Sequence, residues 1–325
     1  MEFGILGPVQ FFGERADMRI TPAGAKQRAL LGALVVKAGQ VVSPDRLVDE
    51  LWGEHPPANA ANALQTHIAR LRRLLPAPAP GSPSGSGSGS GGSRQEWLVT
   101  RPLGYVLRPG RAGTDAQRFC RLAARGRSLA AADPARSAEV LREALALWRG
   151  PALEGAGRGT ICSTGASLLE ESRLIALETL YDACLRAGRA GEVAGELAEL
   201  TASHPLHERF YELLMTALYR CGRQAEALGV YDRARHRLAH DLGVEPGPVL
   251  RGRMESIRHR QDPPPAETAE TGEAAESGEA KGAAGLYPPG SEVARLRQRI
   301  EVLSRQQREL ADRFERLAAD RAASR

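Results

Sequence analysis

The chain has 325 residues, of which 42% are hydrophobic and 26% are charged, and its formal net charge is +5. This length fits about two domains, because a domain usually has about 100–200 residues. No stretch approaches the roughly 18 consecutive apolar residues of a membrane span, and the N-terminus lacks the pattern of a signal peptide. These features exclude a membrane protein and predict a cytoplasmic location.

The N-terminal segments predict a small sheet followed by two helices. Residues 2–12 and 18–20 are short, partly β-branched and interrupted by Gly, Pro and Asp, which indicates antiparallel strands. A leucine-rich helix follows and ends at Gly39, a residue type common just after helices. Ser43 and Pro44 are typical of an N-cap and a first helical residue, so they predict the start of the second helix.

The third predicted helix covers residues 60–75 and has two different faces. Leucine and isoleucine recur at helical spacing and predict a stripe that faces the core. The opposite face has no acidic residue and consists of Asn62, Thr66, Ala69, Arg70 and Arg73. Because any surface helix has a charged outer face, this pattern indicates DNA binding only in its context.

The order of the elements supplies that context. Residues 76–95 form a flexible Gly/Ser insertion, and the alternating segment 97–109 predicts a hairpin. A sheet, three helices and a hairpin are the layout of a winged helix, in which the third helix enters the major groove and the hairpin forms the wing. We therefore predict an α+β DNA-binding domain over residues 1–110.

An internal repeat predicts a second, all-α domain over residues 115–260. The motif Arg-x-Gly-Arg at Gly188 recurs at Gly222, an offset of 34 residues. This is the period of tetratricopeptide helix pairs, which bury their faces against neighbouring pairs. Such a domain binds peptides, packs within its own chain or dimerises, and the sequence leaves these roles open.

The C-terminal region predicts a linker and a coiled coil. Residues 261–290 are acidic and rich in proline, so they are expected to be disordered. Over residues 291–320, apolar residues follow a heptad pattern that predicts a coiled-coil helix. The seam consists of Val293, Leu296, Ile300, Leu303, Leu310, Phe314 and Leu317. It fits self-association, a partner helix or docking on the preceding domain, and the predicted fold class of the whole chain is mainly α.

Enzymatic motifs are absent from the sequence. It has no phosphate-binding loop and no H-E-x-x-H motif, and its four cysteines form no C-x-x-C pair. We therefore predict a non-enzymatic protein without metal or cofactor. The thiols are expected to be buried, with Cys162 as the candidate for exposure because small residues surround it.

Five segments carry a resemblance to a known family. ALLGALVVKAGQVVSPDRLVDELWG, ANALQTHIARLRRLL and VTRPLGYVL resemble the winged helix of the OmpR and PhoB type. LREALALWRGPAL and HPLHERFYELLMTALYRCGRQAEALGVYDRARHRLAHDLGVEPGPVL resemble the bacterial transcriptional activation domain. Together they resemble the Streptomyces antibiotic regulatory proteins, the AfsR/DnrI/RedD group, over residues 1–260.

The resemblance implies an activator of a secondary-metabolite gene cluster. Such a protein binds direct repeats near promoters, acts as an oligomer on double-stranded DNA and recruits RNA polymerase. Its implied DNA-contacting residues lie in the third helix and the wing: Asn62, Gln65, Thr66, His67, Ala69, Arg70, Arg72, Arg73, Thr100 and Arg101. The chain departs from the family in its Gly/Ser insertion, its C-terminal heptads and its Gly-rich segment 154–167, where the packing stays open.

Two alternatives remain at this point. A tetratricopeptide-type adaptor whose N-terminal domain no longer binds DNA would have the same domain order. A repressor of the same architecture would bind DNA in the same way as an activator. Steep salt elution from heparin would favour a DNA reader over the adaptor, because phosphate contacts depend strongly on salt.

Overall fold

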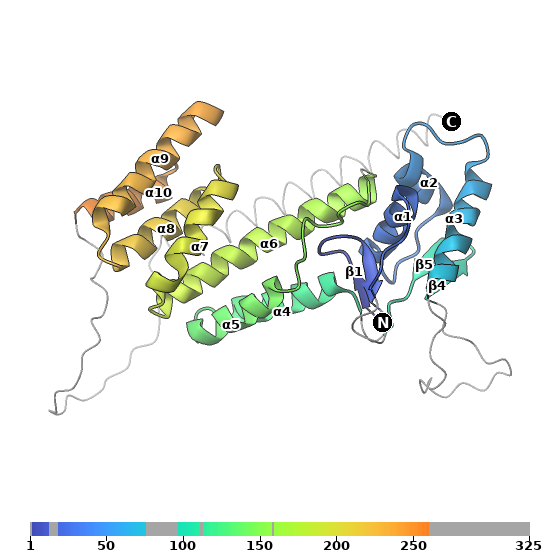
Figure 1. Cartoon of the computed structure of the whole chain (residues 1–325), viewed down its shortest axis with the longest axis horizontal. Helices are drawn as coiled ribbons and strands as arrows, with labels where there is room; N and C mark the ends of the chain where they lie inside the picture. Colours follow the sequence, from blue (N-terminus) through green and yellow to red (C-terminus); the bar gives the residue numbers. More distant parts are fainter. Residues whose placement is uncertain (1, 13–18, 76–96, 111–112, 158, 260–325) are drawn as a thin grey trace, which may run out of the picture. The chain divides into compact units, whose positions relative to one another are not determined.

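A computed structural model describes residues 2–12, 19–75, 97–110, 113–157 and 159–259 (Figure 1). All of these residues belong to one unit of the chain, Met1–Glu267. The predicted Gly/Ser insertion, acidic linker and heptad helix lie outside the described residues.

The N-terminal part has the predicted winged-helix elements. Three antiparallel strands, in the order β1-β2-β3, are β1 (Glu2–Gly4), β2 (Gln10–Phe12) and β3 (Arg19–Ile20). The helices are α1 (Ala25–Val36), α2 (Pro44–Trp52) and α3 (Ala60–Leu74), and the hairpin consists of β4 (Leu98–Arg101) and β5 (Gly104–Leu107). The predicted sheet, helices and hairpin are therefore confirmed.

Local capping fixes where α2 and α3 begin. The Ser43 hydroxyl accepts a hydrogen bond from the Arg46 amide, and Pro44 occupies the first turn of α2, as the sequence predicts. The Asn59 side chain accepts a bond from the Asn62 amide at the start of α3. These caps fix the residues at which the two helices begin.

The wing is attached to the loop before α2. The amide and carbonyl groups of Val42 and Tyr105 bond to each other in both directions, each at 2.9 Å. A Cβ atom on Gly104 would lie 2.0 Å from the Val42 carbonyl oxygen, and Gly104 has a φ of +143°. Only glycine lets the two backbones come this close, and the Val42–Tyr105 bonds then hold β5 against the helices.

The rest of the described chain consists of helices, which confirms the prediction of a mainly α fold. They are α4 (Asp115–Leu129), α5 (Pro134–Leu145), α6 (Thr160–Arg186), α7 (Ala190–Ser203), α8 (Glu208–Arg220), α9 (Gln224–Leu242) and α10 (Pro248–Arg258). The helices pack in sequence, with α5 between α4 and α6, and α8 between α7 and α9 (Figure 1).

The 34-residue repeat corresponds to two equivalent helix ends. Gly188 after α6 and Gly222 after α8 have φ values of +76° and +75°. The Arg189 amide donates to the Cys184 carbonyl at 3.0 Å, and the Arg223 amide donates to the Leu218 carbonyl at 2.9 Å. The repeated motif therefore specifies the same left-handed turn within each of two successive helix pairs, α6–α7 and α8–α9.

Helix α1 is buried on nearly all sides because α6 crosses it. A Cβ atom on Gly32 would lie 3.0 Å from the Leu153 side chain and 3.2 Å from the Cys162 sulfur. A Cβ atom on Gly165 would lie 2.9 Å from the Val36 side chain. The absence of side chains at these two glycines lets the winged-helix and helical parts pack closely.

The segment before α6, whose packing the sequence leaves open, is well packed at its start. The Leu153 amide donates to the Ile5 carbonyl at 2.8 Å, and the Glu154 amide donates to the Gly7 carbonyl at 3.0 Å. Residues 153 and 154 thus bond along the β1–β2 connection. The Gly-rich segment therefore joins the two parts of the unit at this point.

The four cysteines differ in burial, and the structure agrees with the expected burial at only some of them. Cys184 is buried as predicted, whereas Cys120 and Cys221 are exposed. Cys162, the candidate for exposure, is buried with 1% of its surface accessible. It lies in the first turn of α6, where α1 covers it, so the small residues around it allow close packing.

Candidate nucleic-acid interface

Helix α3 exposes the polar face that the sequence predicts. Leu64, Ile68 and Leu71 face the core and are at most 2% exposed. The candidate residues Asn62, Gln65, Thr66, Arg70, Arg72, Arg73, Thr100 and Arg101 are exposed, whereas His67 and Ala69 are half-buried. The structure therefore places the arginines of α3 and β4 on the surface, and His67 partly inside.

Arg72 and Thr100 connect α3 to the wing. The Arg72 Nε atom donates to the Leu98 carbonyl at 3.2 Å, and its terminal nitrogen donates to the Thr100 hydroxyl at 2.7 Å. These bonds orient β4 relative to the helix. Two of the ten candidate residues therefore already bond to each other.

Arg70 and Arg73 differ from Arg72 in their contacts. Within the part of the chain that the structure describes, neither guanidinium group has a hydrogen bond or a salt bridge to another residue. No acidic residue lies on α3. The outer face of α3 is therefore cationic and has donors available for an anionic partner.

His67 packs against the other helices of the winged helix. Its Nδ1 atom lies 2.9 Å from the Gln27 amide nitrogen, and its ring centroid lies 5.9 Å from that of Trp52. Burial lowers the pKa of His67 below its usual value, and the positive charges of Arg70 and Lys26 lower the pKa further. The neutral imidazole thus supports α3 from the side of α1.

We expect the substitution Arg70→Ala to raise the pKa of His67. Burial lowers this pKa most, and the positive charge of Arg70 lowers it next; the substitution removes that charge. NMR titration of the His67 ring protons measures the change. Arg73→Ala is the matched control and is expected to leave the pKa of His67 unchanged. An equal shift in both variants would show that Arg70 is not the arginine whose charge acts on His67.

Two residues of α1, Lys26 and Gln27, also support the site, and no sequence pattern indicates them. The Lys26 ammonium group donates to the Leu51 carbonyl at the end of α2 and lies 5.7 Å from the centroid of the Trp52 ring. Gln27 is almost fully buried, and its side-chain amide bonds to His67. Neither contact has a signal in hydrophobic periodicity, because both depend on packing between helices.

The described residues give no cluster for metal binding and no spanning helix. Among them, no group of three or more His, Cys, Asp or Glu side chains is arranged to hold a metal ion. None of the described helices combines the length and the apolar character needed to cross a membrane. The candidate site is the cationic face formed by α3 and the wing.

Comparison with known proteins identifies both parts of the unit. Residues 20–83 match the family described as "Transcriptional regulatory protein, C terminal". Residues 114–258 match the family described as "Bacterial transcriptional activator domain". The two matches fall on the winged-helix part and on the helices α4–α10.

Relatives that match this chain across both parts include two regulators from Streptomyces. The chain is 44% identical over 264 residues to the transcriptional regulator RedD of Streptomyces coelicolor, covering 81% of this chain and 71% of RedD. It is 36% identical over 267 residues to the regulatory protein DnrI of Streptomyces peucetius, covering 81% of this chain and 93% of DnrI.

A solved structure has the same fold. It is described as Mycobacterium tuberculosis EmbR in complex with a low affinity phosphopeptide, and it superposes with a TM-score of 0.70 at 34% identity. The match covers 81% of this chain and 65% of the EmbR chain.

Proposed function

The chain belongs to the Streptomyces antibiotic regulatory protein family, and we propose that it activates a secondary-metabolite gene cluster by binding direct repeats at promoters and recruiting RNA polymerase. Its membership makes it a DNA-binding transcriptional regulator. The target sequence, the polymerase contact and the DNA-contacting residues are the parts that we propose.

One observation carries the assignment of the DNA-contacting residues. Arg70 and Arg73 lie on an exposed, acid-free face of α3, and neither bonds to another described residue. An unpaired guanidinium group can bond bidentately to guanine in the major groove or to a phosphate oxygen. Asn62, on the same face, can bond to adenine.

The wing contributes in a different way. Arg101 is exposed at the end of β4, beside the turn of the hairpin, and is suited to contact the DNA backbone next to the major groove. Arg72 and Thr100 keep the wing in register with α3 through their mutual bond. We therefore assign DNA contact to Arg70, Arg73 and Arg101, and positioning to Arg72 and Thr100.

The helical part supplies a surface for a protein partner. Leu242, Val244 and Val249 lie around the connection between α9 and α10, and between 47% and 66% of each is exposed. Neighbouring exposed apolar side chains are a common feature of protein-binding sites. This patch supports contact with RNA polymerase or with another copy of the chain on the adjacent repeat.

We expect Arg70→Ala and Arg73→Ala each to weaken binding to the promoter. A base-reading arginine should cost about 1–3 kcal/mol, which corresponds to about 5–150-fold in affinity, and should relax specificity at one position. A phosphate-binding arginine should lower affinity for all sequences and reduce the salt slope by about one unit. Gel shifts on DNA upstream of the adjacent genes measure both effects.

The matched control is Arg251→Ala, which removes an exposed arginine from α10. This variant should bind the promoter as tightly as the parent chain. Unchanged affinity in both Arg70→Ala and Arg73→Ala would remove α3 as the recognition helix. Absence of any promoter binding would favour the adaptor, and a fall in reporter transcription on expression of the parent chain would favour the repressor.

A further inference from the structure

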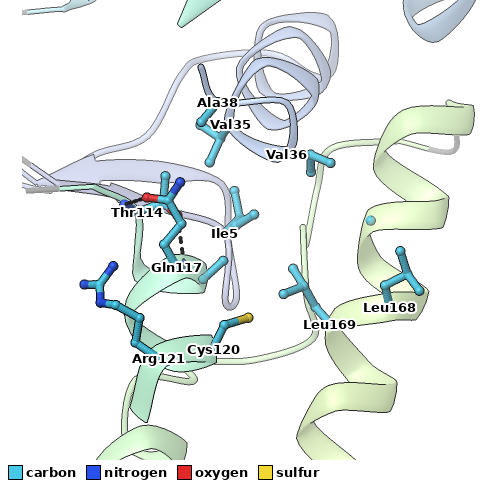
Figure 2. Close-up of a pocket in the computed structure, with 12 residues that line it drawn as sticks. Ile5, Val35, Val36, Ala38, Thr114, Gln117, Cys120, Arg121, Leu168 and Leu169 are labelled. Atoms are coloured by element: carbon cyan, nitrogen blue, oxygen red, sulfur yellow. Dashed lines mark hydrogen bonds between the residues drawn. The ribbon is translucent and has the colours of Figure 1, made fainter. Parts of the chain in front are cut away.

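A cavity of about 420 Å³ lies between the winged-helix part and the helical part (Figure 2). Side chains from the end of α1, from the segment after β1, from α4 and from α6 line it. Its volume falls within the range of about 300–1,000 Å³ that is typical of small-molecule sites, which often lie between domains.

The wall of the cavity is mostly apolar. Ile5, Val35, Val36 and Leu169 project toward the same space from three separate elements (Figure 2). Leu168 also contributes to the lining, although 64% of its surface is exposed. This wall can bury an apolar group, which gains about 25 cal/mol for each Å² of apolar surface removed from water.

The polar part of the cavity is cationic. Arg121 is exposed on α4, and its guanidinium group has no bond to another described residue. None of the described residues that line the cavity is acidic. Arg121 therefore brings an uncompensated positive charge to the cavity.

The other polar residues that line the cavity add no negative charge. The Gln117 carbonyl oxygen accepts a bond from the Thr114 amide at 3.3 Å, which leaves the amide nitrogen of Gln117 as a donor. Although Cys120 is exposed, partial desolvation of its thiol raises the pKa of this group, so the thiol is neutral at physiological pH. The polar groups thus favour an acceptor or an anion over a cation.

We propose that this cavity binds a small amphipathic acid, with its apolar body against Ile5, Val36 and Leu169 and its carboxylate or sulfonate at Arg121. A bound acid would contact α1 of the DNA-binding part as well as α4 and α6 of the helical part. This site is separate from the outer face of α3, so its test does not depend on the promoter assignment.

Two fluorescent probes with the same apolar body test the class of ligand. Anilinonaphthalenesulfonate carries an anionic group, whereas N-phenylnaphthylamine lacks it. We expect the full-length chain to bind the sulfonate more tightly than the neutral probe. Arg121→Gln should weaken binding of the sulfonate by about tenfold or more, because it removes a hydrogen bond between two charged groups, and should leave the neutral probe unaffected.

A second variant tests the location of the site. Cys120→Trp places a large ring in the cavity and should weaken both probes about tenfold or more. The matched controls are Arg125→Gln and Ala124→Trp, which change exposed residues of α4 outside the cavity and should bind both probes like the parent chain. Failure of the full chain to bind either probe, or equal binding by each cavity variant and its control, would overturn the proposal.

Discussion

Replacing Asp115 with alanine is expected to lower the free energy of unfolding by about 3–5 kcal/mol, because it leaves the half-buried Arg149 guanidinium and two buried backbone amides without their acceptor. The Asp115 carboxylate is only 3% exposed. It accepts bonds from the amides of Ile5 and Leu6, at 2.9 and 3.1 Å, and from the Arg149 guanidinium at 2.8 Å. Urea unfolding followed by circular dichroism measures the loss.

Asp133→Ala is the matched control for this prediction. Asp133 is an exposed N-cap, and its carboxylate accepts one bond from the Arg136 amide at 2.9 Å. Loss of such a cap costs about 1 kcal/mol. If Asp115→Ala costs no more than Asp133→Ala, the carboxylate of Asp115 does not hold the β1 segment to α4 in the way that the structure indicates.

The helices and strands were predictable because their ends have local signals. Ser43 caps α2 by accepting a bond from the Arg46 amide, and Pro44 fits the first turn of the helix. Gly188 and Gly222 end helices in a conformation that favours glycine. The apolar stripe of α3 likewise depends on spacing within one helix. Each of these features involves residues that are close in sequence, so a single sequence is enough to find them.

The joint between the two parts was not predictable from such signals. Glycine within a helix usually lowers its stability, yet the missing side chain of Gly32 is what allows α6 to cross α1. Asp115 and its amide partner Ile5 are 110 residues apart. Pairing at this separation depends on the tertiary fold and has no counterpart in composition or periodicity.

The candidate site shows the same division. Hydrophobic spacing on α3 placed Arg70 and Arg73 on the outer face correctly. The bond between Arg72 and Thr100 joins residues 28 apart, on opposite sides of the Gly/Ser insertion, and no sequence pattern predicts it. Which arginines of α3 lack a partner among the described residues, and which one holds the wing, is therefore apparent only from the contacts.

Glu50→Ala is expected to lower the free energy of unfolding by about 2–4 kcal/mol. The N-cap residue of α6 is Gly159, which has no side chain to cap the helix, and Glu50 of α2 takes this role from the other part of the unit. The Glu50 carboxylate accepts bonds from the Ile161 amide at 2.6 Å and from the Cys162 amide at 3.0 Å. Its removal leaves two buried amides without an acceptor, at a cost of about 1–3 kcal/mol each.

The charge of Glu50 adds to this effect, since a carboxylate at a helix N-terminus interacts favourably with the helix dipole. Glu50→Gln keeps one acceptor and loses the charge, so its loss in a urea titration should fall between those of the parent and Glu50→Ala. Asp49→Ala removes the adjacent, exposed carboxylate of α2 and should change the stability by less than about 0.5 kcal/mol. Equal midpoints for Glu50→Ala and Asp49→Ala would mean that α6 does not depend on α2 for its cap.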